Sequence, residues 1–264
     1  MTTRATSTTL RSPDRLVDLA AVGVRCAEYT GHDSDGLART FGATIEGLHV
    51  RAIGSSEHPI YHPSNGVYGF RTLAPGPHRV HIEDPQGRFL PRAVEVTVHD
   101  DVPTWRAALA RGAQPDWSGW NPVSTVALYP APGRHIPPAE TVVYGDVIVD
   151  DDEVPFARVE IDGPDGKVVT YTDQRGTYVT WLRDERSHID TSGDGSVVRT
   201  FERTVRAFRL THSPEPGREL FAFPVDFDDE DALASGDTWQ ELSLSESEIS
   251  FEIGETKRLR IHLP

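Results

Sequence analysis

The stretch that decides the fold runs from Val142 to Leu182: VVYGDVIV (142–149), an acidic turn, VPFARVEIDG (154–163) and KVVTYTDQRGTYVTWL (167–182). Three runs in it alternate apolar and polar residues with the period of two that half-buried strands show, and Gly, Asp or Pro bounds each run. The stretch therefore predicts a strand, a turn carrying the pair Val154-Pro155, a second strand, and a third strand entered through residues 172–176.

A fainter copy of this pattern lies earlier in the chain. Residues 47–53 (GLHVRAI) correspond to residues 155–161, and residues 65–70 (NGVYGF) correspond to the segment around Gly176. The copy continues as LAPGPHRVHI over residues 73–82. Two related β-modules in one chain are therefore expected.

These residues carry a resemblance to a known family. The pattern G-x-V, P-x-x-x-A-x-V, T-D-x-x-G-x-Y/F of the carboxypeptidase-regulatory-like family is similar to residues 145–147, 155–159 and 172–178, with Ala157 one place early. Residues 73–82 resemble that family's L-x-P-G-x-Y-x-V-x-V strand, with His78 in the aromatic position. The resemblance implies an all-β protein of two Ig-like or transthyretin-like antiparallel β-sandwich domains, because the family consists of small seven-stranded sandwiches of transthyretin type.

The chain length of 264 residues fits two sandwiches of about 100 residues each and a connection between them. We expect an N-terminal arm with a possible short helix (1–22), a first β-sandwich (23–100), a Trp/Pro-rich linker (101–140) and a second β-sandwich (141–264). Ser12 and Pro13 suit the start of the short helix.

Composition narrows the classes of function. The net charge of −15 argues against nucleic acid as a partner, because phosphate neutralisation needs a cationic face. Cys26 is the single cysteine, so a disulfide framework and a thiolate metal site are both excluded. The start of the sequence has no apolar core of signal-peptide length, and no run reaches the length of a membrane span. These features predict a cytoplasmic protein, or part of an assembled particle, that does not insert into a membrane.

The linker range is unusually aromatic for a tether. Trp105, Trp117 and Trp120 lie among Pro and Gly residues, and Tyr129 follows them. Such side chains either pack the linker against a domain or contact a neighbouring molecule, since Trp is enriched at interface hot spots. These four residues are the candidate partner-binding residues.

Candidate chemistry is weak throughout. Seven of the eleven histidines precede residue 100, but His78 and His81 are three apart on an expected strand and point to opposite faces. The acidic runs at 150–153 and 226–231 lack the D-x-D-x-D-G spacing of calcium loops. No G-x-S-x-G occurs, and Cys26 has no activating context. The termini also differ from those of the urate-pathway hydrolase of transthyretin fold. We therefore expect no catalytic residues, no metal and no cofactor.

The resulting prediction is a non-enzymatic structural protein whose partners are other protein subunits, with a homo-oligomer as a further possibility. Residues 126–145 also resemble accessory proteins of phage-tail-like contractile injection systems, which implies a role in joining or decorating parts of such a particle or a virion. The alternative is a carbohydrate- or peptide-binding β-sandwich, since Trp faces stack on sugars, and a hydrolase is the third hypothesis.

Overall fold

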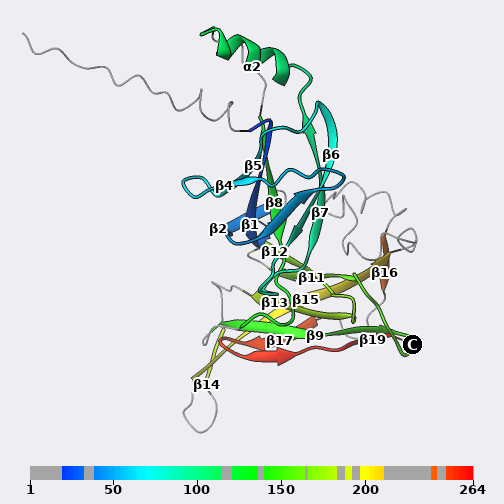
Figure 1. Cartoon of the computed structure of the whole chain (residues 1–264). Helices are drawn as coiled ribbons and strands as arrows, with labels where there is room; N and C mark the ends of the chain where they lie inside the picture. The colour runs from blue at the N-terminus through cyan, green and yellow to red at the C-terminus, as the bar shows by residue number, and fades with distance from the viewer. Residues whose placement is uncertain are drawn as a thin grey trace, which may run out of the picture.

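The computed structural model describes residues 20–32, 39–113, 121–135, 140–163, 166–182, 188–191, 197–210, 239–242 and 248–263. In these ranges the chain is almost entirely β, with a single helix, and the strands form two sandwiches that adjoin each other (Figure 1). The predicted all-β class is confirmed. The helix lacks the length and apolar character that crossing a membrane requires.

The first sandwich is built around β1. Strand β1 pairs antiparallel with β5 and then with β2, and parallel with β8 along its other side, while β4 extends the sheet beyond β5. The facing sheet has the order β3-β6-β7 and is antiparallel. The strand bounds are β1 (Val22–His32), β2 (Arg39–Thr44), β3 (His49–Ala52), β4 (Ile60–His62), β5 (Val67–Phe70), β6 (Gly76–Glu83), β7 (Arg92–Val98) and β8 (Val123–Leu128).

The alternation of apolar and polar residues along the strands determines which side chains form the core of this sandwich. Val24 and Cys26 on β1, Phe70 on β5 and Val80 on β6 are fully buried between the two sheets. Each is one of a series spaced by two along its strand, as a half-buried strand requires. The segments 47–53, 65–70 and 73–82 of the predicted first module contain β3, β5 and β6.

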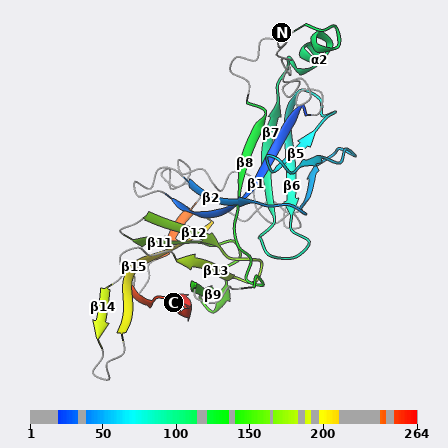
Figure 2. The ribbon, with the colours of Figure 1, turned by 90° about the vertical axis from the view of Figure 1, so that its left-hand side faces the viewer.

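The second sandwich has a sheet of β9, β10 and β13 completed by β18 and β19, both of which run parallel to β9. The opposite sheet has the order β12-β11-β15-β14, with β16 and β17 also on β15, and the β14–β15 hairpin projects from the domain (Figure 2). The strand bounds are β9 (Thr141–Val149), β10 (Asp152–Glu153), β11 (Arg158–Gly163), β12 (Gly166–Tyr171), β13 (Thr177–Leu182), β14 (His188–Thr191), β15 (Val197–Leu210), β16 (Trp239–Leu242), β17 (Glu248–Glu252), β18 (Thr256–Arg258) and β19 (Ile261–Leu263).

The segment 172–176, predicted as the entry to a third strand, is the turn between β12 and β13, so the run 167–182 forms two strands rather than one. The turn is held by its own polar groups. The Asp173 carboxylate accepts hydrogen bonds from the backbone N–H groups of Arg175 (2.8 Å) and Thr177 (3.1 Å). The Thr172 hydroxyl accepts from the Ala157 N–H at 2.8 Å and donates to the Val154 carbonyl at 2.7 Å. These bonds tie the start of β11 to the turn, which explains the T-D spacing of the sequence pattern.

Two further pattern residues hold the C-terminal segment. The Leu259 carbonyl oxygen accepts a hydrogen bond from the Tyr178 hydroxyl at 2.9 Å, and the Leu259 N–H donates to the Tyr144 carbonyl at 2.8 Å. A Cβ atom on Gly145 would lie 1.8 Å from the same Leu259 oxygen. Glycine is therefore required at 145 because the chain between β18 and β19 crosses directly over it.

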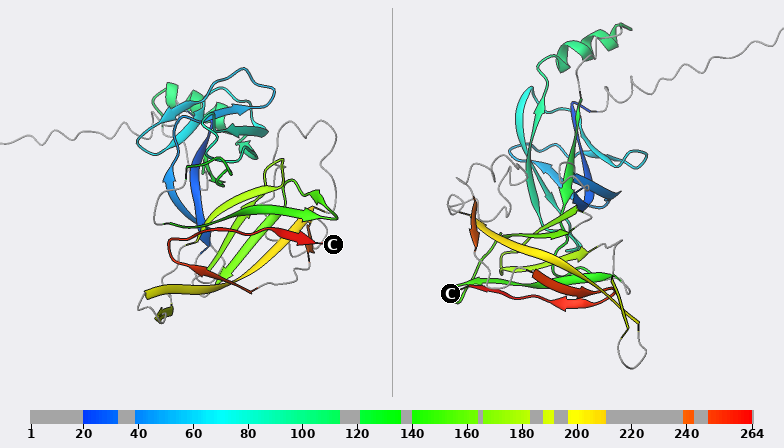
Figure 3. Two further views of the ribbon diagram at one scale, coloured as in Figure 1. Left: turned by 90° about the horizontal axis from the view of Figure 1, so that it is seen from below. Right: turned by 180° about the vertical axis from the view of Figure 1, so that it is seen from behind.

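The two sandwiches meet through a buried aromatic junction. One end of β1 reaches the outer face of β12, on the side of the β11–β12 sheet that points away from its own core (Figures 2 and 3). The ring centroid of Tyr129 lies 4.9 Å from that of Tyr29 and 4.8 Å from that of Tyr171. The buried members of this cluster are Tyr29, Leu90, Ala127, Tyr129, Phe156, Val169 and Tyr171.

Charged groups are also buried at the junction. Arg158 and Glu160 on β11 form an ion pair at 2.6 Å, with side chains 3% and 4% exposed. Alternation places them on the face of β11 opposite the core residues Val159 and Ile161. The Arg134 guanidinium lies 4.6 Å from the Trp181 ring centroid and 4.8 Å from that of Phe89, and pairs with Glu28 at 2.6 Å. The contact between the domains is thus packed like a domain interior.

The range predicted as linker, 101–140, contributes regular structure. Its Ala-rich part is helix α2 (Val102–Ala110), and residues 123–128 are β8, which lies parallel to β1 from Gly23 to Glu28. The sheet of β1 thus includes a strand from the range predicted as linker. The sheets that contain β1 and β9 are mixed, whereas purely antiparallel sheets were predicted. The predicted arm and helix at 1–22 lie outside the described residues up to residue 19.

Candidate functional site

The candidate functional site is the open edge of β3. Among the strands that the structure describes, β3 pairs with β6 alone, so its other side carries no strand. A strand with an unpaired side presents backbone N–H and C=O groups that can pair with another chain. The start of this edge lies beside β5 of the facing sheet, where the Tyr68 hydroxyl contacts the Leu48 N–H.

The register shows which backbone groups point outward. The Ile53 N–H donates to the Arg79 carbonyl at 2.8 Å, so the backbone groups of His49, Arg51 and Ile53 face β6. Antiparallel strands alternate, so the backbone groups of Val50 and Ala52 face the open side. The Ala52 carbonyl accepts from the Ser55 N–H at 3.2 Å, away from β6, in agreement with this alternation.

A groove of about 450 Å³ runs along this edge. Val50, the exposed His49 and Arg51, and also His81 and Glu83 of the paired strand β6 line it, so it extends from the strand edge over the outer face of the β3–β6 pair. We call it the β3 groove. Its lining residues are Leu48, His49, Val50, Arg51, His58, Pro59, Tyr68, His81 and Glu83.

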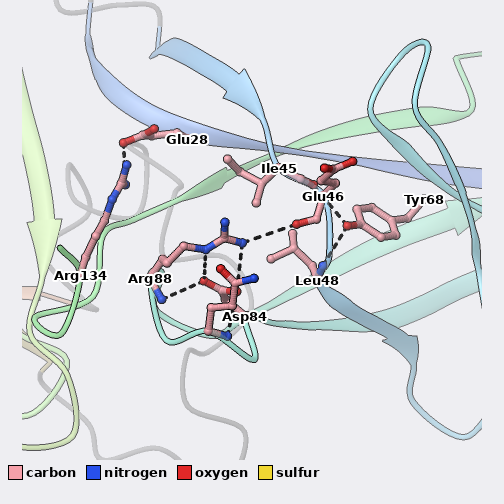
Figure 4. Close-up of polar contacts among 9 residues, drawn as sticks. Glu28, Ile45, Glu46, Leu48, Tyr68, Asp84, Arg88 and Arg134 are labelled. Atoms are coloured by element: carbon pink, nitrogen blue, oxygen red, sulfur yellow. Dashed lines mark hydrogen bonds and ion pairs between the residues drawn. The ribbon is translucent and has the colours of Figure 1, made fainter. Parts of the chain in front are cut away.

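Tyr68 fixes the segment that leads into β3. Its hydroxyl accepts a hydrogen bond from the Leu48 N–H at 3.0 Å and donates to the Ile45 carbonyl at 3.2 Å (Figure 4). Burial raises the pKa of Tyr68, so the hydroxyl keeps its proton and the donated bond persists at neutral pH. The start of the open edge is therefore held by a side chain from the facing sheet.

A second set of bonds holds the turn after β6. The buried Asp84 carboxylate accepts from Arg88 Nε at 2.9 Å, from the Arg88 N–H at 2.8 Å and from the Gln86 N–H at 3.2 Å. Arg88 Nη2 also donates to the Glu46 carbonyl at 3.5 Å (Figure 4). Arg88 thus joins this turn to the segment before β3. Hydrogen bonds from the same sandwich therefore hold the start of the β3 edge in position.

Several polar side chains line the groove. One arginine (Arg51), one carboxylate (Glu83) and three imidazoles (His49, His58 and His81) lie along it. The pKa of His81 is lowered, first by burial and then by the positive charges of Arg51 and Arg79, against the opposing effect of Glu83. The neutral form of His81 is therefore favoured, and it can donate or accept a hydrogen bond without adding charge to the groove.

The sequence-predicted site residues lie elsewhere. Trp105, on α2, is partly buried against the first core and stacks on His99 at 4.9 Å between ring centroids. Tyr129 is 2% exposed and lies inside the junction, in contact with Tyr29, Tyr171 and Arg92. Trp117 and Trp120 lie outside the described residues. The structure does not bring Trp105 and Tyr129 together.

Helix α2 stands at the end of the first sandwich that is remote from the second sandwich (Figure 1). Only Val102 of the helix is fully buried, and the Arg106 guanidinium donates to the Arg71 carbonyl to hold the helix to the loop after β5. Most of the helix surface is therefore accessible.

Three other features were considered as sites: clusters of metal-ligating residues, the acidic run 150–153 and a pocket beside the junction. In the described ranges, no group of three or more His, Cys, Asp or Glu side chains has metal-binding geometry. The acidic run at 150–153 forms the exposed β9–β10 turn, with Asp150 and Asp151 at positive φ. A pocket of about 190 Å³ beside the junction is lined by Trp181, Arg134 and Glu28 among others, and there Arg134 lies against the Trp181 ring.

The β3 groove was missed from the sequence. The segment 47–53 reads as an ordinary strand, and nothing in its residues tells whether one or both sides are paired. The only signal was the concentration of histidines before residue 100, which the structure places partly along this edge.

No protein-family model matches the chain, and no curated protein matches it in sequence. Solved structures that resemble it include a streptococcal ancillary pilin (11% identity, TM-score 0.21), covering 92% of this chain and 62% of the pilin. Another is the minor pilin GBS52 of Streptococcus agalactiae (11%, 0.22), covering 91% and 94%. A third is the shaft pilin SpaA of Lactobacillus rhamnosus GG (7%, 0.20), covering 92% and 97%. The chain thus spans less than two thirds of the first of these, and TM-scores this low support no statement about function.

Proposed function

We propose that this chain is a non-enzymatic structural protein that joins other protein subunits within a larger assembly. The observation that carries this is the open edge of β3, whose residues also line a groove of about 450 Å³. Main-chain hydrogen bonds to such an edge supply affinity, and pockets for alternate side chains supply specificity. The resemblance of residues 126–145 makes a phage-tail-like contractile injection particle the assembly to test first.

The junction supports a structural role. Its aromatic cluster, the Tyr29–Val169 hydrogen bond and the contact of Arg134 with the Trp181 ring tie the two sandwiches together. A protein that joins subunits must transmit their relative position. Two domains packed through a buried interface do so better than two domains on a tether.

Exposed apolar side chains flank the groove. Ile53, directly after β3, is 44% exposed, and Ile60, directly after the groove residues His58 and Pro59, is 39% exposed. Large apolar residues beside an unpaired strand edge are typical of surfaces that another chain covers. Helix α2 with Trp105 supplies a second accessible surface, at the end of the molecule farther from the junction.

The test is site-specific photo-crosslinking in the cells that make the protein. The reactive side chain p-benzoylphenylalanine replaces Ile53, and Ile253, which is 42% exposed in the second sandwich, is the matched control position. We expect a discrete adduct from position 53, with the partner's cross-linked peptide identified by mass spectrometry, and none of it from position 253. Val50→Pro should abolish the adduct, because it removes an outward N–H while leaving the ladder to β6 intact. The same adducts at both positions, or adducts that survive Val50→Pro, would contradict the proposal.

A further inference from the structure

The two sandwiches repeat one plan of strands, so one can be compared with the other. The central strand of each (β1 or β9) pairs antiparallel with one neighbour (β5 or β13) and parallel with the last strands of the domain (β8, or β18 and β19). In the facing sheets, β3 pairs antiparallel with β6 as β11 does with β15. Strand β3 of the first sandwich therefore corresponds to β11 of the second.

The buried side chains fix the register of this correspondence. Three core residues alternate along each strand: Leu48, Val50 and Ala52 in the first sandwich, and Ala157, Val159 and Ile161 in the second. Val50 thus corresponds to Val159, one residue later than the alignment of the two segments by sequence. The Thr172 N–H, directly after β12, donates to the Ala157 carbonyl at 2.9 Å, so the core residues of β11 turn their backbone groups toward β12. The core residues of β3 turn theirs toward the open edge.

The sandwiches differ in the pairing of their fourth strand. In the second sandwich, β12 pairs antiparallel with β11 on the side away from β15. In the first, β4 pairs with β5 of the facing sheet instead. Pro59, directly before β4, lines the groove but has no N–H to donate to a ladder with β3. The position that β12 fills in the second sandwich is thus the position left open beside β3.

Matching hydrogen bonds mark one end of this position. Beside β11, the Ala157 N–H donates to the Thr172 hydroxyl at 2.8 Å. Beside β3, the N–H of its counterpart Leu48 donates to the Tyr68 hydroxyl at 3.0 Å. A hydroxyl group occupies the same place in both sandwiches, and a strand added to β3 must end there, as β12 does.

The other end is the turn after β3, where the Ala52 carbonyl accepts from the Ser55 N–H at 3.2 Å. Between the two ends, no residue that the structure describes forms a hydrogen bond with the Val50 N–H, the Val50 carbonyl or the Ala52 N–H. An antiparallel strand of about five residues satisfies all three groups, since its residue opposite Val50 exchanges two bonds and its residue opposite Ala52 accepts the third.

Strand β12 shows which side chains suit this position. Val168 and Thr170 lie opposite the core residues of β11, and Thr170 is fully buried and donates its hydroxyl to a carbonyl of β13 at 3.0 Å. Both are β-branched, a type that packs well on a half-buried pleat. In the β3 groove, the corresponding side chains lie opposite Val50 and Ala52, where Val50 and Tyr68 supply apolar walls.

We propose that the β3 groove binds an extended segment of a partner protein that runs antiparallel to β3, in the register of β12 on β11, with β-branched residues opposite Val50 and Ala52. This inference rests on the proposed function and specifies the orientation and sequence of its ligand. Along the partner chain, the residue opposite Ala52 comes first and the residue opposite Val50 follows two positions later, as Val168 and Thr170 do in β12.

Disulfide trapping tests the orientation, with a capped peptide of residues 166–172 (GKVVTYT) as the probe. One form of the peptide carries Cys in place of Lys167, and another carries Cys in place of Tyr171. The full chain carries Ile53→Cys or His49→Cys, at exposed positions whose counterparts on β11 lie opposite those two residues. The native Cys26 does not interfere, because burial raises the pKa of its thiol to about 12.

In a glutathione redox buffer, the Ile53→Cys chain should trap the Lys167→Cys peptide roughly tenfold more than the Tyr171→Cys peptide, since only directly opposed residues lie within disulfide reach. The His49→Cys chain should show the reverse preference. Ile253→Cys, at a position of the second sandwich that is 42% exposed, gives the background for each peptide.

Two altered peptides test the sequence. Asp in place of Thr170, opposite Val50, should lower trapping to background, because it places a carboxylate on the apolar side of the groove. Asp in place of Val169, the neighbouring outward position, should leave trapping within about threefold. Equal loss from both replacements would overturn the assigned register. Thermal unfolding of each chain variant checks that its fold is intact.

The outcomes separate this inference from the proposed function. A reversed preference would show a parallel strand, and equal trapping of both peptides would show no fixed register; either result overturns the inference while strand addition at β3 stands. Trapping at background in every combination also overturns it. In that case a position-53 adduct that Val50→Pro removes retains the proposed function, and a missing adduct overturns both. A dimer in sedimentation equilibrium that Val50→Pro abolishes shows a second copy at this edge and overturns the inference.

Discussion

The hydroxyl oxygen of Tyr29, in the first sandwich, accepts a hydrogen bond from the backbone N–H of Val169, in the second, at 3.1 Å. Val169 lies on β12, whose pairing with β11 occupies the other side of the strand. Tyr29 thus supplies the acceptor for a buried N–H group of the second sandwich that does not pair with β11. A side chain of one domain therefore completes the hydrogen bonding of the other.

Tyr29→Phe should lower the free energy of unfolding by about 1–3 kcal/mol, because it leaves the Val169 N–H buried without an acceptor. Chemical denaturation followed by Trp fluorescence measures the change. Tyr144→Phe removes the hydroxyl of a tyrosine that is 37% exposed, and should change the stability by less than about 0.5 kcal/mol. Equal effects of the two substitutions would mean that the cross-domain bond is not stabilising.

Gly145→Ala should be severely destabilising, by about 3 kcal/mol or more, because its Cβ would meet the Leu259 carbonyl oxygen at 1.8 Å. The backbone of β9 or of the C-terminal segment must shift to admit it. Gly133→Ala is the matched control, since its Cβ would find its nearest atom at 4.0 Å. Thermal unfolding of the two variants compares them, and a Gly145→Ala protein as stable as wild type would show that the crossing is looser than described.

Glu160→Gln should cost about 3–5 kcal/mol, because it removes the counter-charge of Arg158 inside the junction. Glu160 also contacts Arg206 at 3.0 Å and Lys167 at 3.8 Å, but Arg206 keeps its ion pair with Asp162, so the main loss falls on the buried Arg158. Asp146→Asn is the control: it breaks a pair with Arg258, whose side chain is 54% exposed, and should cost less than about 1 kcal/mol. The double variant Arg158→Met with Glu160→Leu should recover much of the loss, which denaturant titration measures.

Acid should weaken the first sandwich through Asp84. Burial alone would raise the pKa of this carboxyl, but the bonds from Arg88 and Gln86 outweigh burial and hold the pKa below its ordinary value. A lowered folded-state pKa stabilises the fold above the unfolded value, near 3.9, and this stabilisation is lost as the pH falls through the folded value. Below about pH 4 the Asp84 contribution should therefore disappear.

Asp84→Asn checks this with the pH dependence of unfolding. The variant should be less stable than wild type at pH 7, and the difference should shrink steadily below about pH 4. Asp100→Asn, an exposed residue in the turn before α2, should follow the wild-type curve. A constant difference between Asp84→Asn and wild type at all pH values would assign the effect to geometry rather than to charge.

The local structure of the second sandwich was predictable because its signals are short-range. Thr172, Asp173 and Gly176 form a turn through hydrogen bonds within a few residues and to the adjacent strand. Gly145 and Tyr178, which belong to the family pattern, both contact the C-terminal segment at Leu259. Strand positions followed from the period of two, since one face of each strand is buried in its own core.

The pairings between distant segments were not predictable. The parallel alignment of β8 with β1 joins residues about a hundred positions apart, and the residues 123–128 read as part of a linker. Tyr129 read as a candidate contact residue for the same reason, because its burial depends on the second domain. Arg158 and Glu160 read as outward-facing polar residues of β11, and the sequence carries no sign that the first sandwich covers them. For the candidate site, only the histidine enrichment was visible in advance.

The parallel pairing of β18 and β19 with β9 also sets an order of events during synthesis on the ribosome. Strand β9 is synthesised first among the described strands of the second sandwich, yet β18 and β19, its neighbours on one side, are synthesised after all the others. Until they arrive, one flank of β9 stays bare while the rest of the domain is already made. The sheet around β9 can therefore be completed only after β18 and β19 have been made.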